Sequence, residues 1–217
     1  MNKFILIPAY NPGEILYKLI FKIRQITDAF ILIVDDGSNP KIKLNFKDCN
    51  IINIKNNMGK GFALKFGFNW GIENNYKFAI TLDADGQHSV KFLNDFINTN
   101  DEYDFILGCR EFSINMPVHR RLSNYLTSKI LSLRIGKKIK DSQCGYRRYN
   151  LEKLKNYQFI ENRFMFETEV ILKAIKKDTK IHHIPISTIY ADEISSIKNL
   201  STTINFIKLF FRSFLIK

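Results

Sequence analysis

Continuous apolar runs alternate with helical stripes along the first half of this chain. The runs that read as buried strands are residues 3–10, 29–38, 50–53, 77–85 and 103–110. Apolar positions at helical spacing predict helices between them, at residues 13–26, 59–74 and 89–99. Because strands that are apolar throughout are covered on both faces, the pattern predicts an α/β fold with a mostly parallel, Rossmann-like sheet between two helical layers.

Polar side chains gather where the predicted strands end. The residues at these ends are Asn11, Asp35, Asp36, Asp83, Asp85 and Arg110. In open parallel sheets, ligands bind at the carboxyl ends of the strands. We therefore expect these side chains to converge on one rim of the sheet. Asp35 is the exception, because an aspartate at this place is more typical of a cap on the following turn than of a ligand contact.

The segment Asp83-Ala84-Asp85 carries the sharpest chemical signal. Alternate residues of an extended chain point the same way, so both carboxylates can face one point. Two such charges repel each other unless a cation lies between them. Mg²⁺ or Mn²⁺ bound together with a diphosphate satisfies this need, with Gln87 as a further oxygen donor. His88 either ligates the metal or, as is more typical of its place, stabilises the turn.

The helix predicted at 59–74 opens on Gly59-Lys60-Gly61. It lacks the Ser or Thr that a P-loop requires after Gly-Lys, and Leu64 stands in the place of the third Rossmann glycine. A helix N-terminus still offers N–H groups and a positive dipole end to a phosphate, which makes Lys60 a candidate for donor binding. A plain turn explains the two glycines equally well.

The positive net charge of the chain indicates that it binds an anionic partner. The chain has 217 residues, 45% of them apolar, which is enough for one packed domain and argues against disorder. Its net charge is +12, and residues 110–148 alone hold ten Lys or Arg against two acids. Such a cluster is typical of proteins that bind phosphate, nucleic acid or an anionic membrane, although a solvated basic face is the plainer alternative.

Cysteine usage and hydropathy bear on location. The three cysteines, Cys49, Cys109 and Cys144, are far apart and form no CxxC pair, which favours reduced thiols over a disulfide or zinc site. The apolar stretch at the N-terminus breaks at Pro8, and no window reaches the roughly 20 apolar residues that a membrane-spanning helix needs. We expect a cytoplasmic protein that is soluble or peripheral on the inner face of the cell membrane.

Nine segments carry a resemblance to a known family, and they run through almost the whole chain. They are IPAYN (7–11), VDDGS (34–38), NMGKGFALKFG (57–67), DADGQH (83–88), GCR (108–110), RRLSN (120–124), DSQCGYRRY (141–149), FMFETE (164–169) and IPISTIYADEISSIKN (184–199). In this order they resemble family 2 glycosyltransferases of the GT-A fold, most of all the branch of dolichyl-phosphate mannose synthase and bacterial polyprenyl-phosphate glycosyltransferases. The resemblance implies an inverting, metal-dependent transfer from a nucleotide-diphosphate sugar to a polyprenyl phosphate, dolichyl or undecaprenyl, in cell-envelope biosynthesis.

The resemblance also implies a role for each matching residue. The nucleoside pocket would be lined by Pro8, Tyr10, Val34 and Asp36, with Asn11 and Lys60 completing the nucleotide-sugar set. Asp83, Ala84 and Asp85 would straddle the sugar diphosphate, and Asp85 and Gln87 would hold the metal. Arg110 would face the donor phosphates, and the donor diphosphate or the lipid phosphate would be faced by Arg120, Arg121 and Arg147. Asp141 lies where the family places its candidate catalytic carboxylate, so the catalytic set is Asp141, Asp85 and Arg147.

Several of these residues have a structural alternative. Tyr10 could pack beside its turn, and Asp141 could be an N-cap or pair with a nearby Arg. Glu167 and Glu169 lie on a predicted helix, where a solvated face competes with an acceptor-side role. The chain also departs from the family in two places: Pro12 and Gly13 stand where a Glu often follows Tyr-Asn, and no Arg precedes Lys198. Lys198 is left as the candidate for that phosphate contact.

Residues 200–217 predict a basic, aromatic-rich amphipathic helix that follows a transferase domain at 1–199. Such a helix suits a membrane interface or packs on the domain, and both interpretations are open. A partner membrane subunit would serve the same end. The rival acceptor is a saccharide hydroxyl in cell-surface polysaccharide synthesis, with Asp141 as the base. A nucleic-acid-binding module would leave the acidic rim unexplained, so we expect no nucleic-acid partner.

Overall fold

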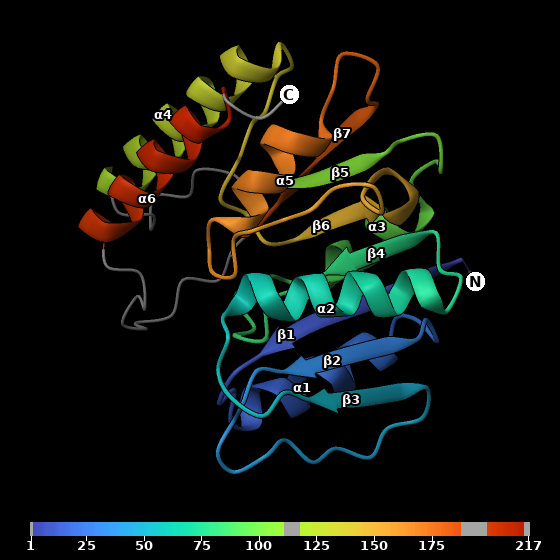
Figure 1. Ribbon diagram of the computed structural model, residues 1–217. Coiled ribbons are helices and arrows are strands. Elements are labelled where there is room, and N and C mark those ends of the chain that lie inside the picture. The colour runs from blue at the N-terminus through green and yellow to red at the C-terminus, as the bar shows by residue number, and fades with distance from the viewer. Residues whose placement is uncertain (1, 111–117, 188–198, 215–217) are drawn as a thin grey trace.

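A seven-stranded mixed sheet forms the centre of the molecule, in the order β3-β2-β1-β4-β6-β5-β7 (Figure 1). The computed structural model describes residues 2–110, 118–187 and 199–214. The strands are β1 (Lys3–Ala9), β2 (Ile31–Asp35), β3 (Cys49–Asn53), β4 (Phe78–Thr81), β5 (Phe105–Arg110), β6 (Arg147–Asn150) and β7 (Ile181–Ile186). The α-helices are α1 (Glu14–Arg24), α2 (Lys60–Glu73), α3 (Leu93–Asn98), α4 (Val118–Ile135), α5 (Phe166–Ala174) and α6 (Asn199–Arg212), with short 3₁₀ turns η1 (Val90–Phe92) and η2 (Leu151–Lys153).

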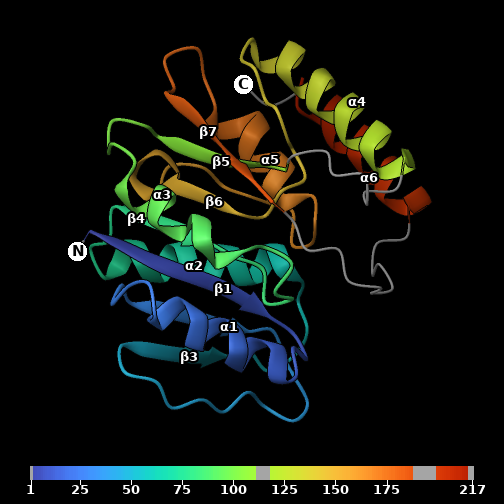
Figure 2. The ribbon, with the colours of Figure 1, turned by 180° about the vertical axis from the view of Figure 1, so that it is seen from behind.

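Helices cover both faces of the sheet, as the apolar strands predict. Figure 1 shows α2 and α5 on the near face, and the reverse view in Figure 2 shows α1 and α3 on the other. Alternate residues of β1 enter the two cores: Phe4 and Leu6 pack toward α2 and α5, whereas Ile5 and Ile7 pack toward α1 and α3. The elements predicted in the first half of the chain are therefore confirmed. Most are a few residues shorter than predicted, but β3 begins one residue earlier, and the helix predicted at 89–99 is divided into η1 and α3.

Helix α2 lies close against β1 because it presents glycine to the sheet. A Cβ built on Gly67 would lie 2.3 Å from Leu6 Cδ1, and one built on Gly71 would lie 2.5 Å from Phe4 Cε1. A side chain at either position would have to displace the buried Leu6 or Phe4 side chain. The two glycines therefore set the separation between this helix and the sheet.

Strand β6 was missed by the sequence analysis because its sequence, RRYN, is not an apolar run. It is nevertheless buried, since both arginines donate to carbonyl oxygens inside the protein. Arg148 donates to the carbonyl oxygens of Phe96, Thr99 and Asn100, and its guanidinium lies 4.6 Å from the centre of the Phe78 ring. These contacts replace the solvation that two buried cations would otherwise lose.

The direction of β6 determines which residues of the chain lie at the rim where the parallel strands end. The strands β1, β2, β3 and β4 are parallel, β6 is antiparallel to β4 and β5, and β5 and β7 are parallel to each other. The carboxyl ends of β1, β2, β4 and β5 therefore share one edge of the sheet. Because β6 runs the opposite way, the segment that precedes it, residues 141–146, also lies at that edge.

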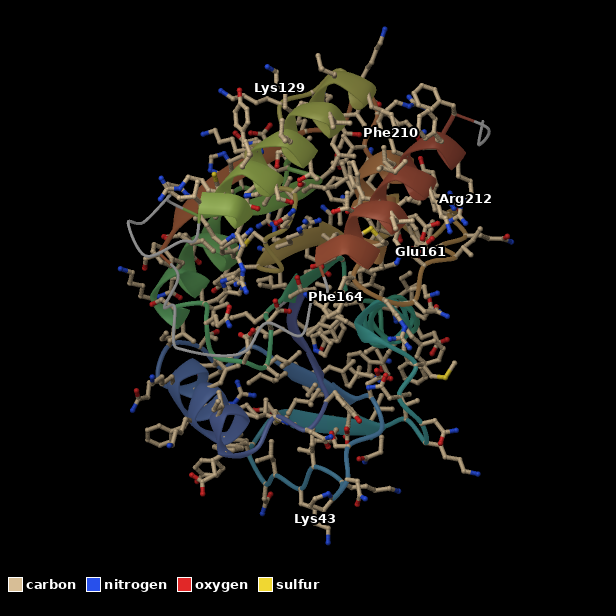
Figure 3. All side chains as sticks on the ribbon, turned by 90° about the vertical axis from the view of Figure 1, so that its left-hand side faces the viewer. Lys43, Lys129, Glu161, Phe164, Phe210 and Arg212 are labelled. Atoms are coloured by element: carbon tan, nitrogen blue, oxygen red, sulfur yellow. The ribbon has the colours of Figure 1, made fainter. Side chains whose placement is uncertain are left out.

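Helices α4 and α6 lie side by side, beyond α5 and away from the sheet (Figures 1 and 2). One face of α6 packs on the domain through Phe206 and Leu209, and Arg212 pairs with Glu161 at 2.8 Å (Figure 3). Arg134 of α4 also donates to the carbonyl oxygen of Ser213, at 2.8 Å. The predicted C-terminal amphipathic helix therefore forms and packs. Across the described ranges, no helix combines the length and the apolarity needed to cross a bilayer.

Candidate active site

The acidic rim begins with Asp83, two residues beyond β4, and its charge is already partnered. Lys60, the first residue of α2, places its Nζ 2.6 Å from Asp83 Oδ1 and 3.3 Å from Glu167 Oε2 in the first turn of α5. Burial alone would raise the pKa of Asp83, but the Lys60 ammonium and His88 hold it well below its usual range. Burial would likewise lower the pKa of Lys60, but the two carboxylates raise it. Both groups are therefore charged at neutral pH.

Asp85 differs from its neighbour because it is exposed and has no cation against it within the described contacts. Its Oδ1 accepts the backbone N–H of Gln87 at 2.9 Å, across a turn in which Gly86 has φ 69°. Partial burial of the carboxyl and the negative charge of Asp83 raise the pKa of Asp85 above its ordinary value. The predicted extended chain does not reach Asp85, because β4 ends at Thr81 and residues 84–85 form a turn. The charge of Asp83 still acts on Asp85 across this turn.

His88, which follows this turn, points its side chain into the protein. It is buried, with its Nε2 3.8 Å from Asp83 Oδ2 and its ring 5.8 Å from that of Tyr146. This placement favours the turn-stabilising interpretation of His88 over ligation.

The donor set fits a cation that shares its coordination with phosphate oxygens. In the part of the chain that the structure describes, no group of three or more His, Cys, Asp or Glu is arranged to hold a metal by itself. Mg²⁺ and its analogues instead use one or two carboxylates together with substrate phosphates. Asp83 and Asp85 supply that number of carboxylates at the strand end.

On the nucleoside side, Asp36 has a structural role that the sequence did not predict. Its Oδ1 accepts the N–H of Met58 at 2.8 Å, and its Oδ2 accepts the N–H of Gly59 at 2.7 Å. The carboxylate is buried and caps the N-terminus of α2, so these two N–H groups are taken by protein rather than offered to phosphate. This placement favours a structural role for Asp36 over the predicted contact with base or ribose.

The other predicted nucleoside residues divide into buried and exposed. Pro8 and Val34 are buried within β1 and β2, so the predicted contact of their side chains with a nucleoside stays a prediction. Tyr10 is 53% exposed, which argues against the packing alternative. Asn11 joins two loops, since its N–H donates to Ser38 Oγ and its Oδ1 accepts the N–H of Asn39.

Two more of the residues singled out in the sequence, Asp35 and Ala84, lie at the same edge of the sheet. Asp35 is fully buried and accepts the N–H groups of Ser38 and Ile42, so it stabilises its own turn as predicted. Ala84 is half-buried between the two carboxylate-bearing residues, on the same turn.

Asp141 is the partner of Arg110. Arg110 donates from Nε to Asp141 Oδ2 at 2.7 Å and from Nη2 to Asp141 Oδ1 at 3.0 Å, a bidentate pair. Asp141 also accepts the N–H groups of Gln143 and Cys144. Burial alone would raise the pKa of Asp141, but these donors lower it. The ion-pair interpretation is what the structure shows, and the carboxylate is a weak base that positions Arg110 at the end of β5.

The prediction that Arg147 faces the phosphates is wrong. Arg147 is fully buried, and its guanidinium donates to the carbonyl oxygens of Cys144, Ser142 and Glu167 at 2.7, 2.7 and 3.2 Å. A side chain whose nitrogens are bound to three carbonyls inside the core has no nitrogen directed to a ligand at the rim. Its role is to hold the segment before β6 against the start of α5.

The solvated-face interpretation of Glu167 and Glu169 is also wrong, because both side chains are buried. Glu167 holds Lys60, as described above, and a Cβ built on Gly145 would lie 2.5 Å from Asp83 Oδ2 and 2.8 Å from Lys60 Nζ. Glu169 accepts the N–H groups of Ile160 and Glu161 and pairs with Lys173 at 2.8 Å. Sequence reasoning assigned neither Glu167 nor Gly145 to the acidic pair, since no local pattern links residues so far apart.

The predicted acceptor residues are only partly placed. Arg120 and Arg121 lie in the first turn of α4 and are half-buried. Lys198 lies outside the described residues. The contacts of these three side chains with a phosphate therefore stay predictions.

Comparison with known proteins places this geometry in context. Residues 4–158 match the model of the family described as Glycosyl transferase family 2. The UDP-N-acetylglucosamine–dolichyl-phosphate N-acetylglucosaminyltransferase of Methanococcus voltae is 30% identical, over 99% of this chain and 95% of that protein. The undecaprenyl-phosphate mannosyltransferase of Micrococcus luteus is 25% identical, over 86% and 83%.

A solved structure with the same architecture supports the fold. Glucosyl-3-phosphoglycerate synthase from Mycobacterium tuberculosis, in complex with Mn²⁺, UDP-glucose and phosphoglyceric acid, superposes with a TM-score of 0.70 at 12% identity, over 97% of this chain and 79% of that one. The predicted GT-A fold is confirmed by this likeness.

Proposed function

The chain belongs to glycosyl transferase family 2, and from that premise we propose that it transfers a sugar from a nucleotide-diphosphate donor to a polyprenyl phosphate, with inversion at the anomeric carbon. It is a glycosyltransferase of the hexosyltransferase type that uses a nucleotide sugar. Two relatives named above act on dolichyl or undecaprenyl phosphate by their names, which supports the same acceptor class for this chain.

The observation that carries the proposal is the engagement of Asp141. A saccharide hydroxyl needs a base to remove its proton, whereas a phosphate acceptor is already an anion at neutral pH. Asp141, the predicted base, is buried and bound to Arg110 and two backbone N–H groups, with its pKa held low. A site whose best-placed carboxylate is committed to an arginine suits an anionic nucleophile.

The remaining chemistry is electrostatic. Asp83 and Asp85 would hold Mg²⁺ or Mn²⁺, with Gln87 as a further donor, and the ion would neutralise charge that develops on the leaving diphosphate. Arg110, fixed by Asp141 at the end of β5, would add a positioned cation on the same rim. A preorganised donor of this kind contributes roughly 3–4 kcal/mol to transition-state stabilisation.

The acceptor is proposed to reach this rim from a lipid surface that contacts α4 and α6. Apolar side chains exposed on these two helices are Val118, Leu122, Tyr125, Leu126, Ile130, Leu133, Ile204, Ile207 and Phe211. An apolar groove of about 680 Å³ runs between the helices, with Arg134 among its lining residues. Neither helix contains an acidic residue within its bounds. An apolar face on two helices whose charged residues are all cations suits an anionic bilayer surface.

This proposal keeps the predicted division into a transferase domain at 1–199 and a C-terminal helix at 200–217, predicted to pack on the domain or to lie at the membrane interface, and it gives that helix both roles. It places the enzyme peripherally on the cell membrane, by lipid contact or through a membrane subunit seated on the same face. Lys129 on the outer side of α4 is suited to lipid phosphates (Figure 3).

An acceptor assay tests the function directly. The purified protein, with Mn²⁺ and a panel of UDP-, GDP- and dTDP-sugars, is expected to form a lipid-linked sugar with dolichyl or undecaprenyl phosphate, detected by mass spectrometry. Free oligosaccharides are expected to yield no product. Transfer to a saccharide hydroxyl without transfer to lipid phosphate would replace the proposal by its rival.

Charge placed on the α4–α6 face should weaken membrane binding. Leu133→Asp and Phe211→Asp are each expected to reduce co-sedimentation with phosphatidylglycerol-containing vesicles at least about fivefold, because a carboxylate opposes both burial in the interface and the negative lipid surface. Phe21→Asp, a matched change on exposed α1, is the control and is expected to bind normally. Equal binding by all four proteins would assign the face to another partner.

A further inference from the structure

We propose that Lys60 is a built-in counter-ion that keeps divalent cations out of the acidic pair until a diphosphate arrives. The inference rests on the proposed function, because it concerns the same metal site. In this role Lys60 makes metal binding depend on the binding of the nucleotide, in addition to any contact that it makes with the donor.

The position of the Lys60 ammonium is built into the fold. Its Nζ lies 2.6 Å from Asp83 Oδ1, and the side chain is only 19% exposed. Asp36 fixes the start of α2 from β2, which places Lys60 at the first helical position. On the opposite side Gly145 leaves no free space, since a Cβ there would press on Lys60 Nζ and on Asp83. A solvent-exposed lysine with a freely rotating side chain would have no such contacts.

The ammonium and a divalent cation compete for the same oxygen. A Mg²⁺ or Mn²⁺ ion bonds a carboxylate oxygen directly, at about 2.0–2.2 Å. Asp83 Oδ1 already holds Nζ at 2.6 Å, so a metal there must displace the ammonium or accept a like charge beside it. Metal binding without nucleotide is therefore opposed by Lys60.

A diphosphate removes this opposition. It brings oxygen ligands to the metal and offers the ammonium a new anionic partner, so the metal and the nucleotide should enter together. Glu167 makes the exchange possible without loss of Lys60 from the site, because it contacts Nζ at 3.3 and 3.4 Å from α5. The ammonium stays anchored while its bond to Asp83 is exchanged.

Manganese titration of the purified protein tests the inference. Free Mn²⁺ is measured by electron paramagnetic resonance for the wild type, Lys60→Met and Lys65→Met, each alone and with UDP or GDP. Lys60→Met is expected to bind Mn²⁺ at least about tenfold more tightly than wild type without nucleotide, and to lose most of the gain that nucleotide brings. Lys65→Met, on the same helix but bound to Asn162, is expected to match wild type.

Two further variants distinguish failure of the counter-ion inference from failure of the metal site itself. Glu167→Gln retains the ammonium on Asp83, so its nucleotide-free affinity is expected to stay weak. Lys60→Gln replaces Lys60→Met if the thermal unfolding of the latter shows that it does not fold. If wild type binds Mn²⁺ with nucleotide and neither Lys60 variant gains affinity without it, the counter-ion inference is overturned alone. If wild type fails to bind Mn²⁺ even with UDP and GDP, the metal site of the proposed function is overturned too.

Discussion

Asp85→Ala is expected to lower metal-dependent affinity for the nucleotide-sugar donor by at least about a hundredfold. Asp85 is the carboxylate of the pair that no lysine occupies within the described contacts, and partial burial together with the charge of Asp83 raises its pKa. Its removal leaves Asp83, which Lys60 already holds at 2.6 Å, as the one carboxylate of the pair. A loss of two powers of ten corresponds to about 2.8 kcal/mol, within the range for a charge-assisted ligand bond.

Isothermal titration with UDP and GDP, with and without Mn²⁺, measures this effect. Ser89→Ala, beyond the same turn, is the matched control and should bind normally. Donor affinity that is unchanged in Asp85→Ala would remove this carboxylate from the metal site. Binding that is lost equally with and without Mn²⁺ would point to a collapsed loop instead.

Arg147→Lys is expected to lower the free energy of unfolding by about 3–5 kcal/mol, the range for removal of one partner from a buried charged network. The guanidinium donates to three carbonyl oxygens that no solvent reaches. A lysine ammonium has no planar fork, so it cannot satisfy all three at once. For a protein of this size the loss corresponds to a melting temperature lower by roughly 10 °C.

Differential scanning calorimetry checks this prediction, with Arg163→Lys on the exposed segment before α5 as the control. The control should melt within about 2 °C of wild type, because substitutions on the surface are usually within 0.5 kcal/mol. A variant at Arg147 that melts normally but turns over slowly would restore the phosphate-facing role that the structure contradicts.

The sequence predicted the sheet where periodicity and burial agree. Strands β1 to β5 are apolar and end in polar residues, so both their existence and their shared rim could be read from the chain. Strand β6 could not, because the burial of Arg147 and Arg148 depends on carbonyl oxygens that the folded chain brings to them, among them those of Glu167 and Phe96. A hydropathy scale scores an arginine as exposed because of its charge, and it takes no account of the hydrogen bonds that allow the side chain to be buried.

The candidate site shows the same division. The acidic pair and Lys60 were visible as residue types at a strand end and a helix start. Their pairing was not, since Lys60 meets Asp83 and Glu167 only after three elements have packed together. The capping role of Asp36 was not predicted for a related reason: an aspartate after a strand serves a ligand or a helix cap equally well, and only the N–H groups of Met58 and Gly59 reveal the cap.

The segment before β6 joins the outer helices to the rim. Ser142 donates its backbone N–H to Ser128 of α4, and the two hydroxyl groups lie 3.0 Å apart. Its neighbour Asp141 holds Arg110 in a bidentate grip. A rigid-body tilt of α4 would therefore displace Ser142 and, with it, the neighbouring carboxylate that holds Arg110. The hydrogen bonds between Ser128 and Ser142 thus couple the orientation of α4 to the arginine at the rim.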